Sequence, residues 1–174
     1  FKDQYDVALS DLPFINSLVA ITRIEVWVTN RNNSTDNTRT ILATMDLGEK
    51  NYYNQNGIIG PNPNFAGPYP ADSANTLYDY LNGNSNFRDV NQVQNEISGV
   101  TQFSASKDYE VVQNARRLAP TEYTFNTRLG YISLNQALNG NEVLAVAFEY
   151  TVGGKTYRVG DLTNTGIDPP KVMF

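Results

Sequence analysis

The sequence has 174 residues, of which 40% are hydrophobic and 18% charged, a composition that fits one globular domain with a core of its own. It contains no cysteine and no histidine, which excludes disulfides, thiol nucleophiles, imidazole bases and Cys or His metal sites. The net charge of −5, with no basic stripe, argues against nucleic-acid binding, and no apolar run reaches the about 18 residues of a membrane-spanning helix.

In two segments of the first 50 residues, apolar and polar side chains alternate along the chain. In residues 21–29, Ile24 and Val28 fall on one face and Trp27 on the other, which predicts a half-buried strand. Residues 40–47 alternate in the same way. A polar, turn-rich run at 30–38 separates the two segments, so we predict a β-hairpin over 21–47 with a long loop.

The loop of this hairpin carries many oxygen atoms. Residues 32–37 could supply ligands to calcium, but the run has one carboxylate and lacks the alternation and terminal glutamate of a calcium loop. A plain hairpin loop is the better interpretation. Asn33-Ser34-Thr35 also matches a glycosylation sequon, a match that carries little weight in an asparagine-rich chain.

Residues 49–72 are predicted to be an irregular loop, because their prolines and glycines prevent a continuous helix or central strand. Their aromatic side chains are too many for a free linker. We therefore expect a candidate interface made of Trp27, Tyr52, Tyr53, Phe65 and Tyr69. For the four loop aromatics, the alternative is packing inward as a lid on the sheet. For Trp27, the alternative is a core position in a strand covered on both faces.

Two short helices are expected within about 73–98. Leu77, Tyr78 and Leu81 form one apolar stripe, with Asp72 or Ser73 as the cap. The second helix would run over 88–98. Its asparagine and glutamine content makes it marginal by propensity.

A β-meander is predicted over about 108–162. The segment 142–152 is apolar on both faces from Val143 to Phe148, as in a central strand; the alternative, a membrane-barrel strand, is disfavoured because the other segments are too polar on both faces. Gly153-Gly154 predicts a tight hairpin turn after it. The order of elements predicts an α+β fold: a mainly antiparallel β-sheet, two-layered, with two short inserted helices. The sequence predicts the following buried core positions in the two longest strands: Ile24, Val26, Val28, Leu144, Val146 and Phe148.

Carboxylates are the only side chains suited to acid–base chemistry. The candidates are Asp72, Asp79, Glu25 and Glu149, and their spacing does not place any two face to face as a glycosidase needs. We expect no enzyme activity, no cofactor and no metal. A carboxylate-only glycosidase remains a third, weaker interpretation.

Several long phrases carry a family resemblance. They are ITRIEVWVTNRN with the later DLGE, DYEVVQNARRL, LGYISLNQALN and EVLAVAFEYTVGGKTYRVGDL, dispersed over about 21–162. Together they resemble the SprA/Sov family of Bacteroidetes, the giant outer-membrane translocon of the type IX secretion system, which is also linked to gliding motility. Residues 49–100 match no phrase of that family.

The resemblance implies an internal piece of a much larger protein. Residues 1–174 would be a single soluble domain excised from that chain, in an extracellular cap-like or a periplasmic region. Its role would be architectural, and its partners other domains of the same translocon, secreted cargo or accessory secretion proteins. A carbohydrate- or cell-surface-binding β-rich module is the alternative, favoured by the tyrosine, asparagine and tryptophan content.

Overall fold

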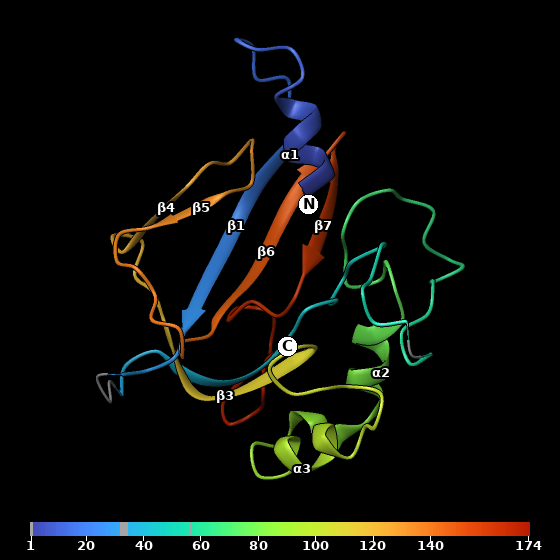
Figure 1. The fold of residues 1–174 in the computed structure, drawn as a ribbon, viewed down its shortest axis with the longest axis vertical. Coiled ribbons are helices and arrows are strands. Elements are labelled where there is room, and N and C mark those ends of the chain that lie inside the picture. The colour runs from blue at the N-terminus through green and yellow to red at the C-terminus, as the bar shows by residue number, and fades with distance from the viewer. Residues whose placement is uncertain (1, 32–34, 56) are drawn as a thin grey trace.

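A computed structural model describes residues 2–31, 35–55 and 57–174. Within these ranges the fold is α+β and mainly antiparallel, as predicted (Figure 1). The main sheet has the strand order β2-β3-β1-β6-β7, and β4 and β5 form a second, two-stranded sheet. The strands are β1 (Val19–Val28), β2 (Thr38–Thr44), β3 (Tyr109–Arg117), β4 (Tyr123–Phe125), β5 (Ile132–Leu134), β6 (Leu144–Val152) and β7 (Lys155–Val159). The helices are α1 (Lys2–Ala8), α2 (Leu77–Gly83), α3 (Val93–Ser98) and a 3-10 turn at Ser85–Arg88.

The predicted hairpin over 21–47 is wrong, because β3 lies between β1 and β2. β2 pairs with β3 along its whole length, whereas β1 pairs with β3 only at Trp27↔Arg117 and Val28↔Arg116. An alternating pattern tells which face of a strand is buried but does not specify its partner. Residues 32–34 of the connecting loop, with the sequon and part of the calcium alternative, lie outside the described residues.

The predicted meander over 108–162 is only partly correct. β4 pairs with β5, and β6 with β7, but β3 pairs with β2 and β1 rather than with β4. A bulge in the β2–β3 ladder places Asn114 at φ 51°, a left-handed conformation that asparagine tolerates better than most residues. The hairpin turn at Gly153-Gly154 is confirmed, and both glycines have positive φ.

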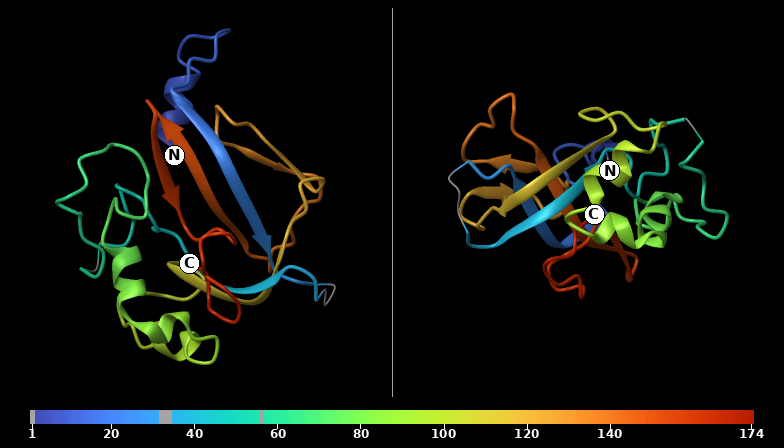
Figure 2. Two further views of the ribbon diagram at one scale, coloured as in Figure 1. Left: turned by 180° about the vertical axis from the view of Figure 1, so that it is seen from behind. Right: turned by 90° about the horizontal axis from the view of Figure 1, so that it is seen from below.

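The main sheet is sharply bent. β1, β6 and β7 run side by side, while β2 and β3 cross the lower end of this group at a steep angle, as Figure 1 and the left view of Figure 2 show. The narrow two-pair contact between β1 and β3 is the hinge of this bend. β2 and β3 are thereby placed next to one face of β1 and β6, the face that carries Trp27.

The last residues of the chain close the bend. The Met173 N–H donates to the Thr40 carbonyl, and the Met173 carbonyl accepts from the Leu42 N–H, as in an added strand beside β2. On the other side, the Phe174 carbonyl accepts from the Asp161 N–H, just beyond β7. The segment 172–174 therefore joins β2 to the end of β7.

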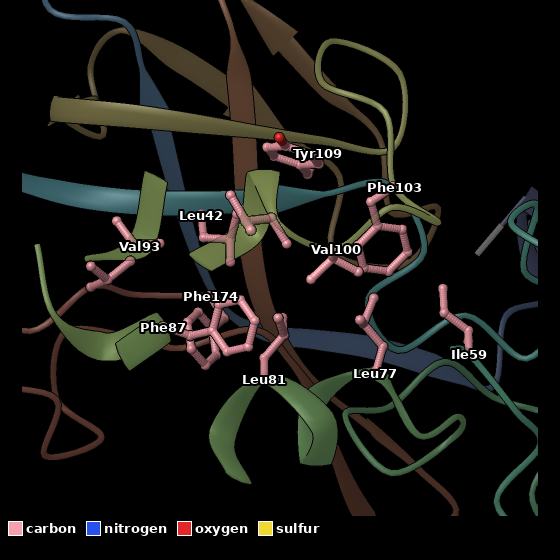
Figure 3. Packing of buried hydrophobic residues seen from close by; sticks show 12 residues of the cluster. Leu42, Ile59, Leu77, Leu81, Phe87, Val93, Val100, Phe103, Tyr109 and Phe174 are labelled. Atoms are coloured by element: carbon pink, nitrogen blue, oxygen red, sulfur yellow. The ribbon is translucent and has the colours of Figure 1, made fainter. Parts of the chain in front are cut away.

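The buried apolar side chains of the described residues form four clusters. The β4–β5 pair covers one face of β1 and β6, where Val26, Val28 and Tyr123 meet. The helices cover the outer face of β2 and β3, with Leu42, Leu81 and Phe174 at the centre of that cluster (Figure 3). A third cluster lies inside the bend, and a fourth joins β1 and β6 at Val19, Ile21, Tyr150 and Val152.

The predicted core is correct for Val26 and Val28, which are buried. Ile24, Val146 and Phe148 are half-buried, and Leu144 is 38% exposed, so its predicted burial is wrong. Leu144 begins β6, and the β6–β7 ladder ends at Phe148↔Val159, so β7 does not extend alongside Leu144.

The middle of the chain follows the prediction more closely. Residues 49–72 contain no helix or strand in their described part. The first helix begins at Leu77, and the side chain of Asn75 caps it by accepting from the Leu77 N–H at 2.9 Å, in place of Asp72 or Ser73. The second helix is shorter than expected, at Val93–Ser98.

Candidate functional site

Trp27, the first residue of the predicted interface, lies inside the bend. It is 3% exposed and packs with Ile41, Ala115 and Met173 between β1 and the β2–β3 pair. The core alternative for Trp27 is therefore the correct one. Its Nε1 atom is buried and has no hydrogen-bond partner among the described residues.

Two of the loop aromatics pack inward. The ring centroids of Tyr69 and Tyr157 lie 5.6 Å apart, and those of Phe65 and Tyr157 lie 6.4 Å apart, edge to face. Tyr150 stacks on Tyr157 and donates its hydroxyl hydrogen to the Pro70 carbonyl. The second half of the loop is thus a cover on β6 and β7, as in the lid alternative.

The first half of the loop separates its two tyrosines. Tyr52 is half-buried against the helical cluster, whereas Tyr53 is 83% exposed. The buried carboxylate of Asp46 fixes this stretch by accepting from the N–H groups of Tyr53 and Asn54, at 2.7 and 2.8 Å. Of the five predicted interface residues, Tyr53 alone presents most of its side chain to solvent.

A buried ion pair joins the 3-10 turn at 85–88, the end of β7 and the C-terminal segment. Asp161 pairs with Arg88, accepts from the Tyr78 hydroxyl at 2.8 Å and accepts from the Phe174 N–H at 2.8 Å. The guanidinium of Arg88 lies 3.5 Å from the centre of the Phe174 ring and donates to the Val172 carbonyl. Burial, reinforced by Asp161, raises the pKa of Tyr78 to about 12. These contacts hold the C-terminal segment 172–174 against the rest of the fold.

Asp72 ties the loop to β7. Its carboxylate accepts from the Gly160 N–H at 2.7 Å and from Nε of Arg158 at 3.2 Å. Burial raises the pKa of Asp72 to about 6, against the lowering effect of these two donors. A carboxyl group with such a pKa could act as an acid or base, but here both of its oxygens bind the fold itself.

Glu25 is buried and accepts from the backbone and hydroxyl of Thr163, at 3.1 and 2.6 Å, with Arg117 beside it. Asp79 is exposed, and Asp72 lies before the first helix rather than on it. In the described ranges no three acidic side chains gather closely enough to hold a metal ion. The buried carboxylates therefore have structural partners, and the expectation of no metal stays a prediction.

The sequence patterns do not predict an exposed apolar surface that lies at the N-terminal end. The segment 5–18 follows no clear period. In the structure it projects beyond the ends of β1 and β6, away from α2 and α3 (Figure 1). Several of its large apolar side chains are exposed, Phe14 at 76%: Val7, Leu12, Phe14, Ile15 and Leu18. The sequence signal for this surface is the density of large apolar residues, because five of them within twelve positions are more than a plain linker needs.

Comparison with known protein families gives a match over most of the chain. Residues 2–138 match the family model SprA_N, described as motility related/secretion protein, which confirms the resemblance found in the sequence. No curated protein matches the chain. Across the described residues, no helix has the length and apolar character needed to cross a membrane.

Proposed function

The chain belongs to the SprA_N family of motility-related secretion proteins, and we propose that it serves such a protein as a non-catalytic architectural module. The observation that carries the proposal is the use of its buried polar groups. Asp72 and Asp161 accept hydrogen bonds from segments distant in the sequence, and Asp46 accepts from the loop that follows β2. These groups hold loops and the C-terminal segment in place, and such a rigid shape suits a structural part.

The larger assembly is the outer-membrane translocon of type IX secretion, with gliding motility as a linked process. Its other domains are the proposed partners of this chain, and secreted cargo or accessory secretion proteins are further ones. The apolar segment 5–18 is the surface best suited to contact such a domain, because five of its large apolar side chains are exposed in the described part of the chain. A position in an extracellular or periplasmic region fits this role.

The carbohydrate-binding alternative gains no support from the geometry. A sugar-stacking platform needs several aromatic faces open on one surface. Trp27 is buried and Tyr69 packs against Tyr157, so of these three aromatic side chains Tyr53 alone is mostly exposed.

The contact role of segment 5–18 is tested in cells that carry the whole secretion protein. Val7, Leu12, Phe14 and Leu18 are replaced by serine together, and secretion and gliding are measured. The matched control replaces Tyr131 and Leu138, two exposed apolar side chains elsewhere, by serine. We expect both variants to melt as the wild type, with secretion reduced only by the first. Equal secretion in all three would contradict the contact.

The non-catalytic role has its own test. Asp46→Asn, Asp72→Asn, Asp161→Asn and Glu25→Gln are compared for secretion and for the melting temperature of the 174-residue chain. In an architectural module the secretion loss follows the stability loss across the series. An enzyme would instead show one variant that keeps its stability and loses secretion, and that result would overturn the proposal.

A further inference from the structure

β6 is longer than its neighbour β7. The β6–β7 ladder runs from Val152↔Lys155 to Phe148↔Val159 and stops there. β1 continues beside β6 to the Val28↔Leu144 pair. After Val159 the chain turns away at Gly160, and Asp161 bonds to Phe174 instead. The stretch 144–147 of β6 therefore has β1 on one side and no strand on the other, within the described part of the chain.

A groove lies along this free edge. A cavity of about 220 Å³ separates residues 144–148 of β6 from residues 43–45 of β2, with Trp27 and Met173 among its walls. A second hollow of about 570 Å³ continues it and shares Thr44, Met45 and Leu144. Three alanines, Ala43, Ala145 and Ala147, are part of the groove wall. Two exposed apolar side chains also line it, Met45 at 63% and Leu144 at 38%.

The groove contains unsatisfied polar atoms. The Nε1–H of Trp27 and the hydroxyl of Thr44 are buried without a hydrogen-bond partner among the described residues, and both residues line the groove. A buried N–H without an acceptor destabilises the fold, because the group has lost its hydrogen bonds to water. A group that enters the groove and offers a carbonyl oxygen would recover part of that cost.

The rim of the groove is acidic. Its charged side chains are Glu49, Asp108, Glu110, Glu142, Asp161 and Lys107. Asp161 is paired with Arg88, and Glu142 with Arg31. In the wall at residues 106–110, the carboxylates of Asp108 and Glu110 stand against the single lysine Lys107. The surrounding potential favours a ligand that carries positive charge next to its apolar part.

We propose that this groove binds an extended peptide segment of another protein, which adds as a strand to the free edge of β6 at residues 144–147. Main-chain hydrogen bonds to β6 give such an addition its affinity, and alternate side chains give it specificity. Small apolar side chains fit against Ala43 and Ala145, and lysine or arginine at the flanks meets the acidic rim. This binding site goes beyond the architectural role.

Trp27 is the only tryptophan of the chain, so its fluorescence reports on the groove alone. The probe is the synthetic peptide Lys-Val-Ala-Val-Ala-Lys with blocked ends, titrated into the 174-residue chain. We expect a saturable change in emission. The same peptide with proline in place of its first alanine lacks one backbone N–H donor and should give no change in emission. A peptide with glutamate in place of both lysines should bind at least about tenfold more weakly, as should the lysine peptide at high salt.

Variants of the groove complete the test. Ala43→Leu and Ala145→Leu fill it and should weaken binding at least about tenfold, whereas Ala66→Leu, at an exposed loop position, should not. If filling disrupts folding, Met45→Lys at the exposed mouth leaves the core untouched, and should weaken the lysine peptide and strengthen the glutamate peptide. The absence of a saturable signal, equal binding of the proline peptide, or binding unaffected by both Ala43→Leu and Met45→Lys each overturns the proposal.

Discussion

Arg88 shows how much a single side chain contributes to this fold. It neutralises the buried Asp161, donates to the Val172 carbonyl and lies over the Phe174 ring, so one guanidinium joins the helical region, the end of β7 and the C-terminal segment. A planar group with five donors can make these contacts together, whereas a lysine could not. The pair holds its position because both partners are buried and further hydrogen bonds satisfy the carboxylate.

Replacing Arg88 by methionine should therefore lower the free energy of unfolding by about 3–5 kcal/mol, because Asp161 would remain buried without its counter-charge. The control is Arg116→Met, which breaks a partly exposed pair with Glu122 and should cost less than about 1 kcal/mol. Urea unfolding of both variants measures the two losses. Losses of equal size would show that the buried pair has no special weight.

Asp72 gives the stability a defined pH dependence. Its pKa is about 6 in the folded chain against 3.8 for the free side chain, so the folded state binds the proton more tightly. The stability from this group is fully present below pH 3.8 and is lost as the pH rises through about 6. Relative to Asp72→Asn, which does not titrate, the wild type should lose stability between about pH 4 and pH 7, by at most about 3 kcal/mol at about 1.4 kcal/mol per pKa unit.

Unfolding curves of the wild type and Asp72→Asn at several pH values check this expectation. The difference between the two free energies is the quantity to plot, because every other titrating group cancels in it. A difference that stays constant with pH, or that moves in favour of the wild type as the pH rises, would contradict the raised pKa.

At the scale of elements, the segment 49–72 is a cover without regular structure. Its second half is fixed by aromatic contacts to β7 and by backbone hydrogen bonds, among them Asp72 N–H to the Arg158 carbonyl at 2.8 Å. Its first half is fixed by the Asp46 carboxylate. An irregular segment held in this way belongs to the folded core, although its side chains have no period that a sequence pattern could reveal.

Two tyrosines of this cover should differ in their effect on stability. Tyr69→Ala removes the ring that packs on Tyr157 and should lower the free energy of unfolding by about 1–3 kcal/mol, since the side chain is half-buried. Tyr53→Ala removes an exposed ring and should change it by less than about 0.5 kcal/mol. Thermal melting of both variants decides. A large loss from Tyr53→Ala would mean that its ring is also part of the cover.

At the scale of the whole molecule, the C-terminal segment closes a bent sheet. Gly160 makes this closure possible: its φ is +78°, and a Cβ there would lie 3.0 Å from the Phe174 carbonyl oxygen and 3.1 Å from the Ala147 side chain. Gly166 has a similar φ of +81° with open space around it. Alanine at either position would strain the backbone, because both have a positive φ, but only at Gly160 would its Cβ also clash with neighbouring atoms.

Gly160→Ala should therefore destabilise the chain more than Gly166→Ala. The strain of a left-handed alanine is about 1–2 kcal/mol in both variants, and the clash at Gly160 should add about 1–3 kcal/mol. Hydrogen exchange of the Leu42 and Met173 amides, which bond to and from the closing segment, should speed up in Gly160→Ala alone. An equal loss of unfolding free energy in the two variants would show that the segment 172–174 moves to accommodate the added methyl group and that the clash does not destabilise the fold.

The sequence by itself determined the local features. Alternation located β1, the two-sided apolar run located β6, and Gly153-Gly154 located the turn to β7, because each depends on residues adjacent in the chain. The long family phrases identified the family in the same way. The absence of cysteine and histidine limited the chemistry to carboxylates before any fold was known.

Only the tertiary structure decided which strands are neighbours, that Trp27 lies inside, and that β6 keeps a free edge beside a groove. The alternating pattern of β1 and β2 fits a hairpin as well as the observed order, because a strand pattern specifies a face and leaves the partner open. The burial of a side chain such as Trp27 depends on what the bent sheet brings over it. That covering comes from β2, β3 and Met173, which are distant in the sequence.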